Sequence, residues 1–431
     1  MQKSIKLFPF LIFSLLACLS WGQVQIEDLV QKAIEQNYQL QANNYQILRA
    51  QSLNTRGVAG NLPRISLSGN ARTDINNIRL QFFDNREVNQ NNADNYSAGT
   101  NLDIEYPIYE GGAKRARRLQ LKIDAQLSEI NYQTRKEELL RELFNRLADY
   151  QLHERQIKVY ALDTLYWSEI LELRKEMKSL GRGDKTDIIQ IEAELNNSRI
   201  QLQRAEQSSI LARIQIESLT FLDPSKDINL EGLRSFLQSK MVSPLDLGPA
   251  IIRESELQVQ RTNTLLSLSE SALYPTLSLF AGYGFNWSRN AVGVLLSNQN
   301  FGPYGGISLN WTLYDGRRLQ REKEAAKLDM LSREQTLKQQ TRDLDYAKRQ
   351  FQTAIETETA VYQNENKQQE ILRRQYEVFE QQYRQGETDL LEVLNYRRQY
   401  RLSQLNANIA EFQLAQYLIE WLYFDGQLRQ F

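Results

Sequence analysis

Four short segments of the chain alternate between apolar and polar residues. In the second of them, the less polar side chains occupy every other position from Tyr96 to Tyr106. A period of two indicates a β-strand with one apolar face, and aromatic residues at the ends of that face are typical of membrane-barrel strands. A soluble sandwich with one buried face is the alternative. The predicted strands cover residues of about 62–75, 95–108, 274–287 and 304–314, with polar, Asn-rich loops at 85–95 and 289–300.

Two long windows, 113–180 and 317–385, contain neither proline nor glycine and are rich in good helix formers. As a single helix each would be about 100 Å long. Apolar residues recur there at spacings of three and four, first at Leu140, Phe144 and Leu147, then at Leu162, Leu165 and 167–170. This spacing predicts an apolar stripe that packs against other long helices. On helix content alone, an ordinary coiled coil is the alternative.

The same order of elements occurs twice along the chain. Pro63 corresponds to Pro275, the segment 108–111 to 313–316, and the segment 186–190 to 388–392. Because these matches keep their order and nearly the same separation, they indicate a tandem α-β-β-α duplication. The first repeat covers 23–220, with a helical hairpin turning near 180–185. The second covers 248–425, with a turn near 385–388, and the remaining segments are a mixed region at 221–247 and a tail at 426–431.

Four strands are too few to enclose a pore, and an open sheet in lipid leaves edge groups unpaired at several kcal/mol each. Closure therefore requires several copies of the chain. Three copies with four strands each would give a 12-stranded barrel, an even number within the bacterial range.

The composition disfavours most enzyme chemistry. The 431 residues include one histidine, His153, and one cysteine, Cys18. Zinc sites and Ser/His/Asp or Cys/His catalysis need more of these groups, and no cleft-forming fold suggests a glycosidase with paired carboxylates. We expect no cofactor and no metal. With 52 basic and 53 acidic residues, the chain also shows no basic surface for nucleic acid. His153 is interpreted as a surface or packing residue, with a pH sensor as the alternative.

The N-terminal segment resembles an export signal. Two lysines precede an apolar run, and Ser20 and Gly22 place small residues before a polar chain. This pattern predicts a signal peptide at 1–22. The alternative is a lipid anchor on Cys18, which Leu16 disfavours because it is bulky for that motif.

In repeat order, helix length and local motifs the chain resembles the outer-membrane efflux protein family, the TolC-type trimeric exit ducts. The motifs are P-I-Y-E-G-G-A-K-R-A-R-R at 107–118 and L-Y-D-G-R-R at 313–318. The resemblance implies a mainly α-helical protein with a membrane β-barrel contribution: four strands per protomer in a 12-stranded trimeric barrel, and long hairpins forming an α-barrel. It also implies an outer-membrane duct with a periplasmic extension that passively conducts cargo from an inner-membrane pump through a periplasmic adaptor. An exported coiled-coil scaffold that does not conduct is the alternative.

The resemblance also suggests a gate at the hairpin turns. Glu392 and Asn395 match the two aperture positions, the second of which carries Asp in better-known members, while Tyr383 and Asp187 match an interhairpin hydrogen-bond pair. Thr388 stands where the family has an arginine, for which Arg384, Arg182 or Lys185 could substitute. Contact with the adaptor would involve the turn residues Gly181, Arg182, Gly183, Thr186, Gly386, Thr388 and Asp389. Alternatively, these are ordinary helix termini capped by Asp187 and Asp389.

Overall fold

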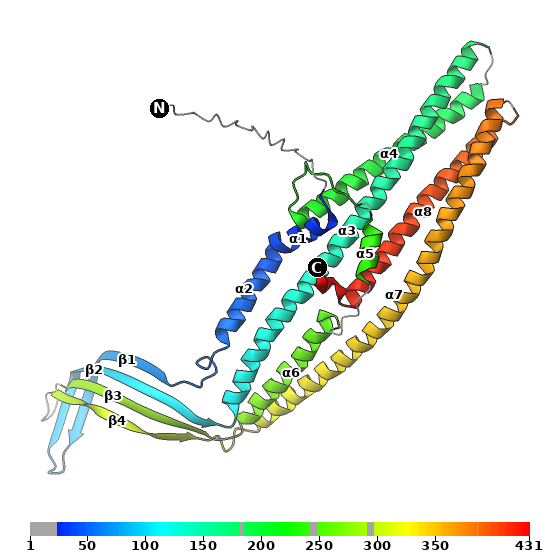
Figure 1. The fold of residues 1–431 in the computed structure, drawn as a ribbon. Coiled ribbons are helices and arrows are strands. Elements are labelled where there is room, and N and C mark those ends of the chain that lie inside the picture. Colours follow the sequence, from blue (N-terminus) through cyan, green and yellow to red (C-terminus); the bar gives the residue numbers. More distant parts are fainter. Residues whose placement is uncertain (1–23, 182–184, 231, 242–247, 291–296, 386) are drawn as a thin grey trace, which may run out of the picture. The chain divides into compact units, whose positions relative to one another are not determined.

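A computed structural model describes residues 24–181, 185–230, 232–241, 248–290, 297–385 and 387–431 (Figure 1). The expected signal peptide therefore lies outside the described residues. The chain forms two compact units. One, here the hairpin unit, comprises Met1–Tyr38, Lys136–Leu245 and Lys348–Phe431, and the other, the strand unit, comprises Gln39–Arg135 and Asp246–Ala347.

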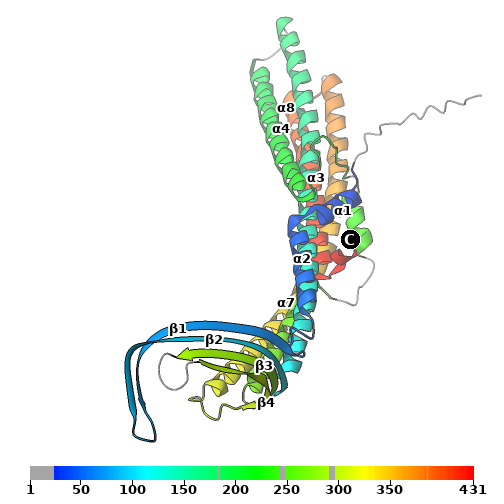
Figure 2. The ribbon, with the colours of Figure 1, turned by 90° about the vertical axis from the view of Figure 1, so that its left-hand side faces the viewer.

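The strand unit contains one antiparallel sheet in the order β1-β2-β3-β4. The strands are β1 (Arg64–Gln81), β2 (Glu87–Glu110), β3 (Thr276–Asn290) and β4 (Ser297–Asn310). The two repeats therefore meet where β2 pairs with β3, and Figure 2 shows the four strands curving together. Edge strands β1 and β4 each have a neighbour on one side only.

The register of the sheet sorts its residues onto two faces. Leu102 pairs with Tyr283, and the neighbouring pair of Asp103 with Gly282 belongs to the opposite face. On that polar face the hydroxyl of Tyr304 donates to Asp103 across Gly282. A Cβ on residue 282 would lie 2.7 Å from a Tyr304 atom, so only glycine leaves room for this contact. The predicted alternation is thus confirmed as one apolar and one polar face.

The strands are longer than the alternation predicted. β1 continues to Gln81 and β2 begins at Glu87, so most of the expected loop at 85–95 is strand. The hairpin instead turns at Asn85, which has a φ of 61°, a left-handed conformation that asparagine tolerates. Likewise β3 reaches Asn290 and β4 begins at Ser297, so both ends of the expected loop at 289–300 belong to strands.

Helices complete the strand unit. They are α2 (Tyr38–Leu53), α6 (Ala250–Ser271) and the first parts of α3 (Ala113–Ser179) and α7 (Arg318–Gln385). Ile123 and Leu127 of α3 form a buried cluster with Leu257 of α6. Beside this cluster Asp124 accepts a hydrogen bond of 2.7 Å from Arg261. The second repeat is therefore joined to the first by helix packing as well as by the sheet.

The hairpin unit contains two long helical hairpins. The first joins α3 to α4 (Lys185–Thr220), and the second joins α7 to α8 (Leu390–Phe424) (Figure 1). Leu140, Phe144 and Leu147 are fully buried, as their spacing predicted. In the next stretch the prediction is confirmed for Trp167, which is 2% exposed, and is wrong for Leu162 and Leu165, which are 62% and 56% exposed. No helix in these described ranges has the length and apolar character needed to cross a membrane.

Short elements lie beside the hairpins. They are α1 (Ile26–Gln36), α5 (Leu233–Lys240) and the 3-10 helix η1 (Gln427–Gln430). Val24 forms a parallel bridge with Ile228, and the ring of Phe431 lies 5.3 Å from Phe144 and 5.6 Å from Phe236, measured between centroids. In the described part of 221–247, helix α5 therefore contacts the C-terminal Phe431, and Ile228 joins the region to the N-terminal Val24.

Candidate functional site

The candidate gate residues that the resemblance implied lie at or near the two hairpin turns. Gly181 follows the end of α3 with a φ of 76°, a conformation that glycine adopts without strain at a helix C-terminus. Thr186 lies in the first turn of α4 and is exposed. Arg182, Gly183 and Gly386 lie outside the described residues.

Asp389 caps helix α8. Its Oδ1 accepts a hydrogen bond of 3.0 Å from the backbone N–H of Glu392, and the hydroxyl of Thr388 donates to the Glu392 carboxylate. A side chain that accepts from the third helical N–H satisfies a backbone donor that the helix itself leaves free. The capping interpretation is thus confirmed for Asp389. It is wrong for Asp187, which lies inside the first turn of α4.

Glu392 and Asn395 lie on one exposed line of α8. They are three residues apart, so their side chains share a face of the helix. Asn395 Oδ1 accepts a hydrogen bond of 3.3 Å from Gln399, which continues the same line. The first turns of α8 therefore present a carboxylate and two amides away from the buried side of the helix.

Asp187 and Tyr383 are linked through a third residue, Arg174 of α3. A guanidinium nitrogen of Arg174 lies 3.9 Å from Asp187 Oδ2, and the guanidinium carbon lies 5.0 Å from the centroid of the Tyr383 ring. Arg174 thus contacts both residues, and the direct hydrogen bond between Asp187 and Tyr383 that the resemblance implied stays a prediction. Arg174 is 12% exposed, and its Nε is buried without a hydrogen-bond partner in the described part of the chain.

The other proposed substitutes for the family arginine behave differently. Arg384 donates at 2.8 Å to Glu380 of its own helix, and its side chain is exposed. Lys185 is exposed at the start of α4. The geometry therefore singles out Arg174, which sequence reasoning missed. A signal for it existed, because Arg174 lies six residues before the turn at 180–185 and Asp187 two residues after it, so a long arginine side chain can reach across the hairpin.

An apolar cluster below the turns joins the two hairpins. Trp167 of α3 and Ile191 of α4 pack with Leu390 and Leu394 of α8, and Tyr383 packs against the same cluster. Side chains from both hairpins thus share one core. The turns of a single chain are therefore fixed to each other by burial of apolar surface.

A buried carboxylate lies beside this cluster. Asp163 of α3, 1% exposed, accepts hydrogen bonds from Arg401 at 2.6 Å, Arg397 at 3.2 Å and the indole N–H of Trp167 at 3.1 Å. The guanidinium of Arg397 also lies 4.2 Å from the ring centroid of Tyr166. A buried charge is tolerated only when it is paired and hydrogen-bonded, and Asp163 meets both conditions.

Aromatic rings complete the contact between the hairpins. Tyr166 of α3 lies 6.1 Å from Tyr376 of α7, centroid to centroid, in an edge-to-face arrangement. Burial raises the pKa of both phenols above their usual range, because desolvation disfavours the phenolate. Sequence reasoning missed this whole group, although an aspartate inside the apolar run 160–167 is a signal for a buried charge.

In the described ranges, no group of three or more His, Cys, Asp or Glu side chains could hold a metal ion. The site consists instead of helix caps, ion pairs and aromatic contacts. Such an arrangement can hold two hairpins together and present polar groups at their ends.

Comparison with known proteins relates the chain to one family. A profile of the family described as outer membrane efflux protein matches residues 29–220 and 250–420. No curated protein matches the sequence.

Solved structures share the fold at low sequence identity. The outer membrane protein VceC from Vibrio cholerae is 14% identical, with 93% of this chain and 95% of that chain covered and a TM-score of 0.77. The CmeC outer membrane channel of Campylobacter jejuni is 16% identical, with 93% and 85% covered and a TM-score of 0.73. The open state of the MtrE outer membrane channel of Neisseria gonorrhoeae is 15% identical, with 93% and 88% covered and a TM-score of 0.69.

Proposed function

Because the chain belongs to the outer membrane efflux protein family, a family of channels rather than enzymes, we propose that it is the exit duct of a tripartite system. Three copies would form a 12-stranded barrel in the outer membrane, continued into the periplasm by helices. An adaptor would bind the hairpin turns, and an inner-membrane pump would supply both the energy and the cargo. The observation that carries the proposal is the four-stranded sheet with one exposed apolar face and two open edges.

The apolar face of the sheet needs an apolar environment, and its two edge strands need further strands to pair with. On its apolar face Leu67 is 73% exposed, and Ile65 and Leu309 are similarly exposed. Their contact with lipid would remove this surface from water. In lipid, however, the unpaired backbone groups of β1 and β4 would each cost several kcal/mol. Pairing β4 of one copy with β1 of the next satisfies these groups, which supports a closed ring.

Helix α7 buries little of its surface within the described part of the chain. Helix α7 has 68 residues, yet Tyr376 alone is buried among its described side chains. Its exposed apolar residues include Leu328, Ile371 and Val378. A helix of this length gains most of its stability from packing, so a neighbouring copy is the natural partner for this surface.

The line formed by Glu392 and Asn395 would face the inside of the closed end. Three copies of Glu392 brought together would form an acidic ring that attracts cations. The three copies of Asn395 beside this acidic ring would form a second ring that is polar but uncharged. Arg174, held between Asp187 and Tyr383, would couple the two turns of each chain during opening. The turn residues Gly181, Arg182, Gly183, Thr186, Gly386, Thr388 and Asp389 would be available to the adaptor.

The first test is the native mass and membrane fraction of the detergent-extracted protein, followed by conductance in a planar bilayer. A trimer in the outer membrane that conducts ions is the expected result. A water-soluble monomer or dimer in the periplasm would overturn the proposal and favour the non-conducting scaffold.

A further inference from the structure

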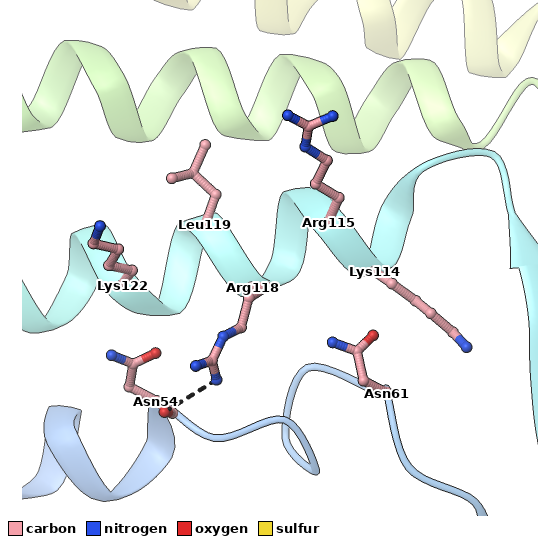
Figure 3. A pocket seen from close by; sticks show the side chains of 7 residues that line it. All are labelled: Asn54, Asn61, Lys114, Arg115, Arg118, Leu119 and Lys122. Atoms are coloured by element: carbon pink, nitrogen blue, oxygen red, sulfur yellow. Dashed lines mark hydrogen bonds between the residues drawn. The ribbon is translucent and has the colours of Figure 1, made fainter.

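Basic side chains surround a cavity in the strand unit, at the start of helix α3. The cavity has a volume of about 870 Å³. Lys114, Arg118 and Lys122 follow one another at intervals of four residues, so they form a stripe along one side of the helix. Figure 3 shows Arg118 pointing toward Asn54 across the cavity, while Arg115 and Leu119 point toward α6. The lining residues are Asn54, Asn61, Lys114, Arg115, Arg118, Leu119 and Lys122.

No acidic residue lines this cavity. Arg118 donates at 3.2 Å to the backbone carbonyl of Asn54, and Lys114 donates to the carbonyl of Pro107 while lying 4.4 Å from the ring centroid of Tyr106. These partners fix the two cations without neutralising them. The first turn of α3 also contains no acidic residue. Cations at this end of a helix are unfavourable, since the helix dipole is positive there.

The second repeat provides an internal comparison. The tetrapeptide R-R-L-Q occurs at 117–120 and again at 317–320, at the start of α7. On α7 the basic residues have acidic partners: Arg318 pairs with Glu322 at 2.8 Å, and Arg321 with Glu324 at 2.6 Å. The duplicated helix starts are thus alike in sequence but differ in their partners. Within the described residues, Arg117 of α3 pairs with Glu110, whereas Arg118, the counterpart of Arg318, binds a backbone carbonyl and no carboxylate.

The cavity also offers neutral polar groups and an apolar surface. Asn54 Oδ1 is buried and has no hydrogen-bond partner within the described part of the chain. It can accept a hydrogen bond from a ligand hydroxyl. Leu119 is exposed beside the cations. A ligand that suits this lining carries a negative charge, a hydroxyl donor and an apolar portion.

We propose that this cavity binds the phosphate headgroup of an anionic glycerophospholipid, with phosphatidylglycerol as the best fit. The lysines and arginines pair with phosphodiester oxygens, a glycerol hydroxyl donates to Asn54, and an acyl chain lies against Leu119. The position of the cavity agrees with a lipid ligand, because α3 begins at Ala113, directly after β2 ends at Glu110. This inference rests on the proposed function, which puts the ends of the strands at the membrane surface.

The test compares two charge-matched variants of the full-length protein. R115Q/K122Q removes two cations from the cavity, and R318Q/R321Q removes two neutralised cations from the start of α7. Native mass spectrometry of each protein in detergent, titrated with dioleoyl phosphatidylglycerol or dioleoyl phosphatidylcholine, measures lipid binding. We expect wild type and R318Q/R321Q to prefer phosphatidylglycerol and R115Q/K122Q to bind it about thirtyfold more weakly.

Two results would overturn the assignment. One is equal binding of phosphatidylglycerol by R115Q/K122Q and wild type, and the other is no preference for phosphatidylglycerol over phosphatidylcholine. If inorganic phosphate alone displaces the lipid at millimolar concentration, the ligand is free phosphate rather than a headgroup. Bilayer conductance separates the two proposals, because a conducting wild type without lipid preference refutes only this one.

Discussion

Replacing Asp163 by asparagine should lower the free energy of unfolding of the hairpin unit by about 3 kcal/mol. The substitution keeps the size of the side chain and leaves Arg397 and Arg401 without a counter-charge. Breaking a buried ion pair costs about 3–5 kcal/mol. The two guanidinium groups keep some contact with water, being 14% and 13% exposed, which places this case at the lower end.

Thermal unfolding of the full-length protein in detergent, followed by circular dichroism, measures this loss. At roughly 2–4 °C per kcal/mol for a unit of this size, the midpoint should fall by about 6–12 °C. Glu370→Gln is the matched control. Hydrogen bonds from Arg373 and Arg374 lower the pKa of Glu370 to about 2, yet its side chain is 43% exposed, so the midpoint of Glu370→Gln should change by no more than about 1 °C.

A third variant separates charge from packing. Replacing Asp163, Arg397 and Arg401 together by methionine removes all three buried charges, and such replacements are often neutral or stabilising. Its midpoint should lie well above that of Asp163→Asn. If Asp163→Asn and Glu370→Gln shift the midpoint equally, burial is not what makes the Asp163 cluster important and the reasoning fails.

Three further predictions concern the gate and the buried tyrosines. Arg174→Gln should raise the open probability in bilayers about tenfold, since it removes an ion pair and a cation–π contact, whereas Arg384→Gln should not; equal effects would contradict the assignment. Glu392→Gln should lower the cation preference measured by reversal potential, and an unchanged potential would remove Glu392 from the pore. Burial raises the pKa of Tyr376, so this phenol stays protonated to higher pH in the folded state than in the unfolded state. Its contribution to the free energy of unfolding is therefore lost as pH rises above about 10. Tyr376→Phe should flatten the fall in thermal midpoint between about pH 9 and 11, and a slope like that of wild type would refute this.

The sequence predicted the strands well where one face is apolar and poorly beyond that region. Alternation predicts that Leu102 and Tyr283 each lie on an apolar face, and in the sheet they pair on the same face. Toward the hairpin turn both faces are polar, and a strand such as 87–95 then looks like a loop. What holds it extended is pairing with β1, including a hydrogen bond of 3.0 Å from Arg79 to Asn89. Such cross-strand partners leave no pattern within either segment.

Helix spacing was similarly ambiguous where long helices have more than one packed face. Around residue 163 the sequence offers both leucines and aromatic residues as a core stripe. Asp163 and Trp167 are buried, whereas Leu162 and Leu165 remain exposed, because Arg397 and Arg401 from α8 supply the charge that allows an aspartate inside. Predicting this required knowing which helix faces which. Single-chain periodicity does not contain that information.

The duplicated turn motif shows why a local match does not fix a role. T-D-I-I-Q at 186–190 and T-D-L-L-E at 388–392 are nearly the same, yet α8 begins after its aspartate and α4 begins two residues before its own. Asp389 therefore caps a helix, whereas Asp187 is carried around the first turn to face Arg174. Shifting the helix start by three positions moves a side chain to a different side of the axis, since a turn takes 3.6 residues. The motif thus caps a helix in one repeat, and in the other it pairs with Arg174, which also contacts Tyr383 of the second hairpin. Arg174 rather than Asp389 is therefore the position to test for gating.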